Sequence, residues 1–184
     1  MSDILISLPS SLQIMTFKYL VHPNERVLLI GNPGVGKTSF IRRLNSGQYS
    51  SRYVPTDSIV YNPINSRVNV VEIGGQWRFS SSYEKATNPT RIIIMADVTS
   101  KLSINDIIGF YIPRYRHYNV PITVIFNKTD VPRRDWRQSE LSAFSKKLAT
   151  LSQEIRHVNV VWTSLKNCDD TDMNVNFQHL MSEF

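Results

Sequence analysis

The feature that most constrains this chain is the octapeptide GNPGVGKT at residues 31–38, which completes a GxxxxGK[ST] pattern. It directly follows the apolar run VLLI at 27–30, so a strand, a glycine-rich turn and a helix start occur in the order that a phosphate-binding loop needs. Glycines let consecutive N–H groups turn toward an anion, and the next helix adds its positive N-terminal end. In such a loop Lys37 reaches the β- and γ-phosphates and the Thr38 hydroxyl ligates Mg²⁺. The alternative, a glycine-rich surface turn, does not explain the preceding strand, so we expect a nucleoside triphosphate site or a descendant of one.

Composition narrows the class of protein further. The 184 residues suffice for one domain with its own core, and the single cysteine, Cys168, allows no internal disulfide. No apolar stretch approaches the roughly 20 residues needed to cross a bilayer.

Residue 2 is Ser and the chain ends MSEF, so the lipidation patterns are missing and we expect no membrane anchor. The net charge of +6 is scattered, which favours a solvated surface over a nucleic-acid face. We expect an intracellular protein, cytoplasmic or nuclear.

Short β-rich runs alternate with amphipathic segments, which predicts βαβ units. The expected fold is α/β, a P-loop NTPase three-layer sandwich with a mostly parallel six-stranded sheet and helices on both faces. Strands are expected at 26–31, 59–64, 68–73, 91–97, 122–127 and 158–162. Helices are expected at 37–46, 79–86, 103–117, 137–153 and 173–182.

Two of these helices carry specific local signals. The sequence SIND at 103–106 resembles a capping box that would open the third helix, and Pro113 should kink that helix or end it early. The fourth helix has apolar residues at three- and four-residue steps, which predicts one buried face. That face comprises Leu141, Phe144, Leu148, Leu151 and Ile155.

A second motif, NKTD at 127–130, stands where the fifth strand ends. A buried carboxylate at Asp130 would accept hydrogen bonds from guanine N1–H and the 2-amino group, whereas adenine offers neither donor. Sites built in this way can reject an analogue that lacks the partner group by roughly 10⁴. Asn127 would bond the ring edge at N7, and the Lys128 stem would cover the base plane. Alone, NKxD is a modest signal that also occurs in plain turns. At the end of a strand that follows a P-loop in the sequence, it predicts a guanine-binding site.

Together these motifs resemble the Ras superfamily of small GTPases, with details closest to its Ran and Rab branches, over about residues 25–168. The segment GQYSSRYVPT at 47–56 is similar to switch I. By that likeness Tyr49 lies against the guanine, and Thr56 ligates Mg²⁺ and senses the γ-phosphate. The segment TSLK at 163–166 resembles the SAK loop, with Leu165 in place of alanine. For Tyr49 an ordinary half-buried aromatic and for Ser164 a plain turn residue stay open as alternatives.

The resemblance and the motifs imply a full set of site residues. The catalytic residues would be Gln76, which orients the attacking water, and Lys37, which neutralises phosphate charge. The metal ligands would be Thr38, Thr56 and Glu72. The residues that bind the cofactors, GTP or GDP with Mg²⁺, would be Asn32, Pro33, Gly34, Val35, Gly36, Lys37, Thr38, Ser39, Tyr49, Thr56, Gly75, Asn127, Lys128, Asp130, Ser164, Leu165 and Lys166.

The chain departs from the family pattern at two positions. Family members carry DxxGQ before switch II, but residues 72–76 read EIGGQ, so Glu72 replaces the aspartate that holds Mg²⁺ through water. The extra methylene must move the carboxylate or bend its rotamer, and Mg²⁺ demands near-ideal octahedral geometry. A solvated strand-end acid without a metal role is the alternative for Glu72. Pro33 removes an N–H beside the γ-phosphate and occupies the space of an incoming arginine finger.

We expect residues 1–24 to form an N-terminal apolar helical extension ahead of a G domain at 25–184. A helix that is apolar on nearly every side is not stable facing water. We expect it to pack on the G domain; the alternative is a surface for a partner or for self-association through residues 8–22.

The leading hypothesis is a Ran/Rab-like molecular switch that binds GTP with Mg²⁺ and hydrolyses it slowly. Effectors or regulators would dock on residues 47–58 and 74–86. Glu72, Pro33 and the short C-terminus motivate an alternative, a catalytically weak or inactive GTPase-like binding module that mimics or sequesters partners of small GTPases. A basic accessory protein for nucleic acid depends on charge alone and is the weakest hypothesis.

Overall fold

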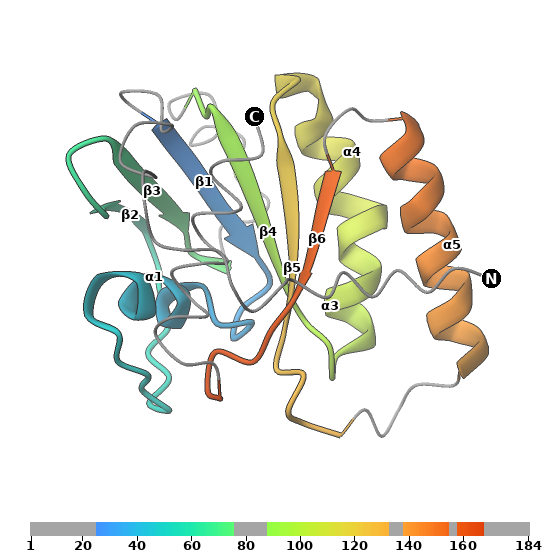
Figure 1. Cartoon of the computed structure of the whole chain (residues 1–184), viewed down its shortest axis with the longest axis horizontal. Helices are drawn as coiled ribbons and strands as arrows, with labels where there is room; N and C mark the ends of the chain where they lie inside the picture. The colour runs from blue at the N-terminus through green and yellow to red at the C-terminus, as the bar shows by residue number, and fades with distance from the viewer. Residues whose placement is uncertain (1–24, 76–87, 133–137, 155–157, 168–184) are drawn as a thin grey trace, which may run out of the picture.

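The computed structural model describes residues 25–75, 88–132, 138–154 and 158–167. These residues form a six-stranded sheet in the order β2-β3-β1-β4-β5-β6 (Figure 1). β2 (Ile59–Pro63) runs antiparallel to β3 (Val68–Ile73), and the other neighbours are parallel. The predicted α/β class and the mostly parallel six-stranded sheet are therefore confirmed.

The strands lie within a residue of the predicted bounds. β1 (Glu25–Gly31), β4 (Arg91–Asp97) and β5 (Ile122–Asn127) occupy the middle of the sheet, and β6 (Val158–Trp162) is an edge strand. β4 and β5 are buried almost along their whole length, as continuous apolar strands between two layers should be. β-Branched residues suit this pleated, fully packed setting.

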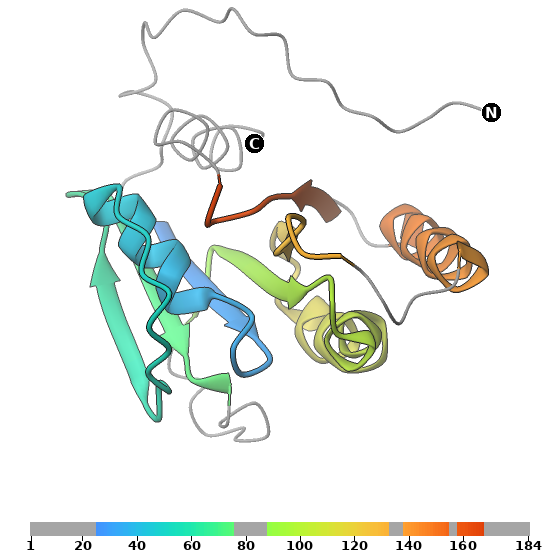
Figure 2. The same ribbon diagram turned by 90° about the horizontal axis from the view of Figure 1, so that it is seen from below.

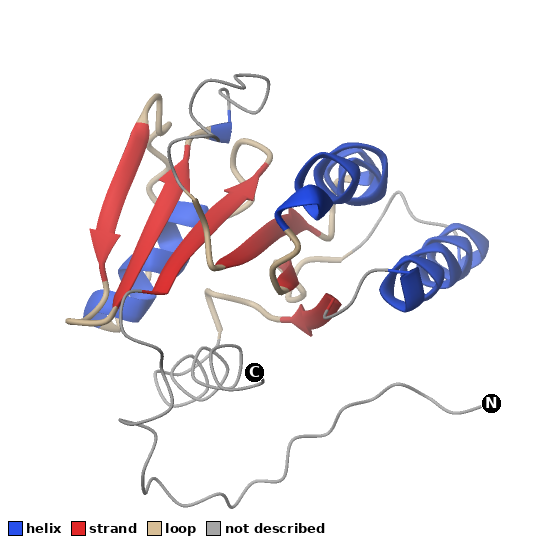
Figure 3. Cartoon of the chain, turned by 90° about the horizontal axis from the view of Figure 1, so that it is seen from above, coloured by secondary structure: helices blue, strands red, loops and turns tan. Residues whose placement is uncertain are grey.

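Helices cover both faces of the sheet. α1 (Lys37–Ser46) packs on one face through Phe40 and Ile41. The opposite face carries a continuous helical segment, made of α3 (Lys101–Asp106), a π-helical turn η3 (Ile107–Tyr111), α4 (Ile112–Tyr115) and a 3₁₀ turn η4 (Arg116–Tyr118). α5 (Gln138–Glu154) lies beside that segment (Figures 2 and 3). None of the helices that the structure describes combines the length and the apolar character needed to cross a bilayer.

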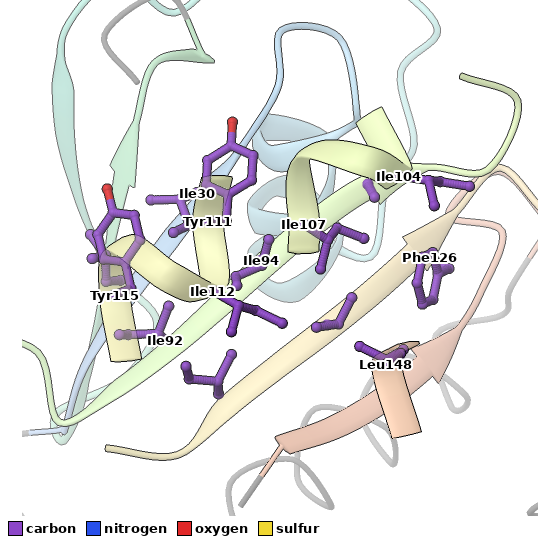
Figure 4. Close-up of a cluster of buried hydrophobic side chains, with 14 of the residues drawn as sticks. Ile30, Ile92, Ile94, Ile104, Ile107, Tyr111, Ile112, Tyr115, Phe126 and Leu148 are labelled. Carbon is purple, nitrogen blue, oxygen red and sulfur yellow. The ribbon is translucent and has the colours of Figure 1, made fainter. Parts of the chain in front are cut away.

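The larger core cluster lies between the sheet and this second helical layer (Figure 4). Ile92 and Ile94 of β4 belong to the same cluster as Ile107 and Tyr111 of η3, and each of these four residues is at most 1% exposed. Phe126 of β5 meets Phe144 of α5 edge to face, with ring centroids 5.7 Å apart. Phe144 and Leu148 are buried as predicted, which confirms the described part of the α5 face.

The strand order reverses on either side of β1, which has β3 on one flank and β4 on the other. In parallel sheets such a switch point opens a crevice outside the carboxyl ends of the strands. The chain leaves β1 at Gly31, β4 at Asp97 and β5 at Asn127, all at this edge. The topology therefore gathers the predicted phosphate and base motifs in one place.

The sequence misplaced the start of the helix after β4, and one of its two alternatives for Pro113 was wrong. The helix begins at Lys101, because Ser100 rather than Ser103 is its N-cap and accepts a hydrogen bond from the Ser103 amide at 3.2 Å. The Ser103 hydroxyl instead accepts from the Asp97 amide at 3.0 Å. The helix does not end early at Pro113, because the turn just before it widens to π geometry and Ile112 N–H donates to the Ile107 carbonyl. A residue that lacks an N–H is accommodated in this way without ending the segment. The alternative, a kink at Pro113, stays a prediction.

Several predictions fall outside the described residues and stay predictions. They are the N-terminal extension at 1–24, the helices at 79–86 and 173–182, and Gln76, Ile155 and Cys168.

Candidate nucleotide-binding site

The loop between β1 and α1 curls around the Lys37 ammonium group. Lys37 Nζ donates to the carbonyl oxygens of Gly31 at 2.9 Å and Asn32 at 3.0 Å, and the residue is only 5% exposed. Burial lowers the Lys37 pKa to about 8, although the nearby Glu72 carboxylate raises it in part. Anionic oxygens in front of this amine would favour its charged form. Gly36 adopts φ 108°, and no side chain among the described residues caps the α1 N-terminus.

The three residues predicted as metal ligands come together beside Lys37. Thr38 Oγ1 donates to Glu72 Oε1 at 2.6 Å and lies 3.1 Å from Thr56 Oγ1. Thr56 Oγ1 is 3.4 Å from the same carboxylate oxygen. Glu72 is only 2% exposed, so it is not a solvated strand-end acid, and its metal role stays a prediction. A hydroxyl that donates to a carboxylate keeps lone pairs for a cation, so this oxygen cluster can accept a hard metal ion.

Asn127 joins the phosphate loop to the loop after β6. Its Nδ2 donates to the Val35 carbonyl at 2.8 Å, and its Oδ1 accepts from the Leu165 amide at 3.1 Å. The residue is buried, yet its amide nitrogen has a second hydrogen, which leaves a donor for an acceptor in the cavity. The Leu165 carbonyl oxygen accepts a hydrogen bond from Arg43 Nε of α1 at 3.1 Å.

The base motif is organised by two acid–donor pairs. Ser164 Oγ donates to Asp130 Oδ1 at 2.6 Å, so the serine orients this carboxylate. Lys128, whose φ is +66°, holds its ammonium group 2.6 Å from Asp97 Oδ2. The Asp97 pKa is lowered: its burial acts in the opposite direction and is outweighed by hydrogen bonds from Lys128 and Thr99. Asp130 is exposed rather than buried as we expected, although it lines the cavity.

A cavity of about 460 Å³ runs from the phosphate loop to the base motif. Such a volume is typical of small-molecule sites. Of the predicted binding residues, the structure places along its wall Pro33, Gly34, Gly36, Lys37, Thr38, Ser39, Tyr49, Thr56, Glu72, Gly75, Asn127, Lys128, Asp130, Leu165 and Lys166. These come from segments far apart in the sequence, and Tyr49 is 41% exposed.

Three predicted binding residues do not line this cavity. The Val35 side chain is buried in the core beside α1, and its carbonyl serves Asn127. Ser164 acts on Asp130 and not on the cavity itself. Asn32 turns its side chain toward the segment after β4, so only its carbonyl faces Lys37. Each of these three reaches the site through a partner or through its backbone.

The sequence did not predict two wall residues, Arg42 and Val131, or the link made by Arg43. Arg42 stands four residues after Thr38, so the helical repeat of α1 would have placed both on one side. The remaining wall residues, 50–55, belong to the predicted switch I segment.

Gly75 approaches the phosphate loop so closely that a side chain would not fit. A Cβ built on Gly75 would overlap the Pro33 backbone nitrogen and lie 2.7 Å from the Asn32 carbonyl carbon. The segment that follows β3 is therefore in direct contact with the loop at Pro33.

Gly36 and Gly34 offer a matched test of the packing around Asn127. Both have positive φ, +108° and +74°, so alanine strains the backbone at each position. Only at Gly36 would the new Cβ meet a neighbour, Asn127 Nδ2 at 2.5 Å. We expect Gly36→Ala to lower the free energy of unfolding by about 1–3 kcal/mol more than Gly34→Ala, because it also displaces a buried amide. Urea denaturation measures both, and equal losses would contradict the packing.

Comparison with known proteins agrees with this arrangement. A family model described as the Ras family matches residues 26–181, which is most of the chain. The match includes the phosphate loop, the Glu72–Gly75 segment and the base motif. The chain is therefore a member of the Ras family of small GTPases.

Proposed function

We propose that the chain is a guanine-nucleotide switch with slow, Mg²⁺-dependent GTP hydrolysis. The observation that supports this best is the chemistry at the two ends of the 460 Å³ cavity. One end has a buried ammonium group and a helix N-terminus, which suit phosphates. The other end has an exposed carboxylate held by a serine, which suits a base that donates two hydrogen bonds.

At the phosphate end Lys37 neutralises the β- and γ-phosphates, and the backbone amides of residues 34–38 face the same anion. Pro33 contributes no amide, so one donor that the loop would otherwise offer is missing. Gln76 orients the attacking water in this proposal. Because phosphoryl transfer proceeds by positioning and charge stabilisation, no covalent nucleophile is needed.

Thr38, Thr56 and Glu72 would hold Mg²⁺, which when bound would offset the negative charge of the phosphates. No group of three His, Cys, Asp or Glu side chains that could hold a metal occurs among the described residues. That fits Mg²⁺, because this ion is bound by one or two carboxylates together with phosphate and water. Thr38 and Thr56 approach the Glu72 carboxylate from separate segments, α1 and residues 47–56.

At the base end Asp130 accepts from the guanine edge, while Tyr49 and the Lys128 stem border the ring on the cavity wall. A bound base would cover Asp130, so an adenine there would leave the carboxylate desolvated without its partners. Residues 47–58 and 74–86 would order around the γ-phosphate and present the effector surface. The spacing of switch I from Lys37 is the same as in Ran, which favours the Ran branch.

Nucleotide preference is the direct test of this function. We expect titration calorimetry with Mg²⁺ to show GDP bound at least a hundredfold more tightly than ADP. Asp130→Ala removes the acceptor while leaving the phosphate end intact, so the GDP preference should fall below tenfold. Glu140→Ala, which removes a partly exposed carboxylate of α5 away from the cavity wall, is the control. Equal binding of GDP and ADP by the unaltered chain would refute the proposal.

The metal role of Glu72 is tested by removing its charge. Glu72→Gln should weaken Mg²⁺ binding to the GDP complex by about tenfold or more, because an anionic ligand becomes neutral. Faster GDP release, approaching the rate in EDTA, is expected and is measured with a fluorescent GDP analogue. Glu25→Gln, a buried glutamate at the opposite end of β1, is the matched control. If both variants release GDP at the same rate, Glu72 has no metal role.

A catalytically inactive binding module is the second candidate, favoured by the packing of Pro33 against Gly75. By the family likeness Pro33 stands beside the γ-phosphate, where an activating arginine would need room. Single-turnover hydrolysis separates the candidates. The switch predicts slow phosphate release that is lost in Gln76→Leu, whereas the module predicts release no faster than in that variant.

A further inference from the structure

Asn32 belongs to the phosphate loop, but its side chain points to the helical segment after β4. Its Oδ1 accepts a hydrogen bond from the Tyr111 hydroxyl at 2.8 Å. Its Nδ2 donates to Asp106 Oδ2, also at 2.8 Å. Asn32 is 7% exposed and Tyr111 is 1% exposed, so the tyrosine hydrogen bond is buried. A buried amide satisfied at both ends in this way has a defined orientation.

The Asn32 backbone lies at the phosphate end of the cavity, beside Lys37 and Gly75. Its carbonyl oxygen accepts from Lys37 Nζ at 3.0 Å. Its carbonyl carbon and the following Pro33 nitrogen are the atoms against which Gly75 packs. A rotation of this one peptide would therefore shift both Lys37 and the start of the segment after β3. Asn32 connects the helical layer to the phosphate end of the cavity.

The π-turn explains how two residues of one helix reach the same amide. Asp106 and Tyr111 are five positions apart, which on a regular α-helix puts them about 140° apart around the axis. Asp106 is the N-cap of η3 and Tyr111 is its last residue, and the Ile112 amide donates to the Ile107 carbonyl five residues earlier. A turn closed in this way brings residues five apart onto nearly the same side. Tyr111 and Tyr115 both project from this segment in Figure 4.

We propose that Tyr111 and Asp106 are positioning residues that, through Asn32, set the phosphate loop for nucleotide retention and hydrolysis. This inference rests on the proposed guanine-nucleotide function. Loss of the Tyr111 hydroxyl frees the Asn32 side chain, loosens the Lys37 contact and weakens the hold on the phosphates. The guanine preference is unaffected, because Asp130 and Ser164 lie at the other end of the cavity.

The test compares Tyr111→Phe with Tyr115→Phe in the full chain. Tyr115 lies on the same segment, is 2% exposed and stacks on Tyr118. Tyr115→Phe therefore also removes a buried hydroxyl and is the matched control. We expect Tyr111→Phe to release GDP about five- to tenfold faster and to lower the single-turnover hydrolysis rate similarly. Tyr115→Phe should change both rates less than twofold, and both variants should keep the preference for GDP over ADP.

The Asn32 dependence is tested in a second background. In Asn32→Ala, adding Tyr111→Phe should change GDP release less than twofold, because the shared partner is gone. Asp106→Ala should reproduce the faster release, while Asp106→Asn, which keeps an acceptor oxygen, should rescue it. A full effect of Tyr111→Phe that persists in Asn32→Ala, or equal effects of the two phenylalanine variants, would overturn the inference.

A readout without nucleotide separates this inference from the proposed function. Amide hydrogen exchange of the peptide covering residues 31–38 should be faster in Tyr111→Phe than in Tyr115→Phe. If the unaltered chain binds no guanine nucleotide, the proposed function fails while the exchange comparison still decides the inference. Equal exchange in the two variants would overturn it, whatever the nucleotide results.

Discussion

The side-chain amide of Asn127 is the contact on which the arrangement of the site depends. It is placed at the carboxyl end of β5 by pairing of that strand with β4, and from there it holds Val35 on one side and Leu165 on the other. These two hydrogen bonds fix the phosphate loop relative to the loop after β6. Because the amide is buried, leaving either bond unmade would cost about 1–3 kcal/mol. A side chain at position 36 would not fit, because the Asn127 amide occupies the space beside Gly36.

The phosphate end combines buried groups of opposite charge. Lys37 and Glu72 are both almost fully buried, and a buried charge is costly unless it is paired and hydrogen-bonded. Two carbonyl oxygens satisfy the lysine in part, and two threonine hydroxyls contact the carboxylate. The lowered pKa of Lys37 reflects the remaining cost of burying its charge. Such an arrangement is what a site needs if anions and a cation are to bind to it, because its groups are already oriented.

Much of this architecture could be predicted from local patterns. The strands were found because runs such as the isoleucines at 92–94 are apolar on both faces, and α1 was found because a glycine-rich loop must end at a helix. The helix start after β4 was missed because Ser100 and Ser103 are both acceptable caps. In the structure the Ser100 hydroxyl accepts from the Ser103 amide, whereas the Ser103 hydroxyl accepts from the Asp97 amide, and that second contact depends on how the strand end meets the helix.

The sequence by itself determined which chemistry this chain contains, because the phosphate loop and the NKTD motif are local and their spacing from the strands is fixed. It also determined the sheet, through the positions of its apolar runs. Only the tertiary structure decided where the individual side chains point. The Asn32 side chain joins partners 74 and 79 residues away, Asp130 is exposed on the cavity wall, and Glu72 is enclosed by two threonines. These outcomes depend on the packing of distant segments around the switch point, which no local pattern records.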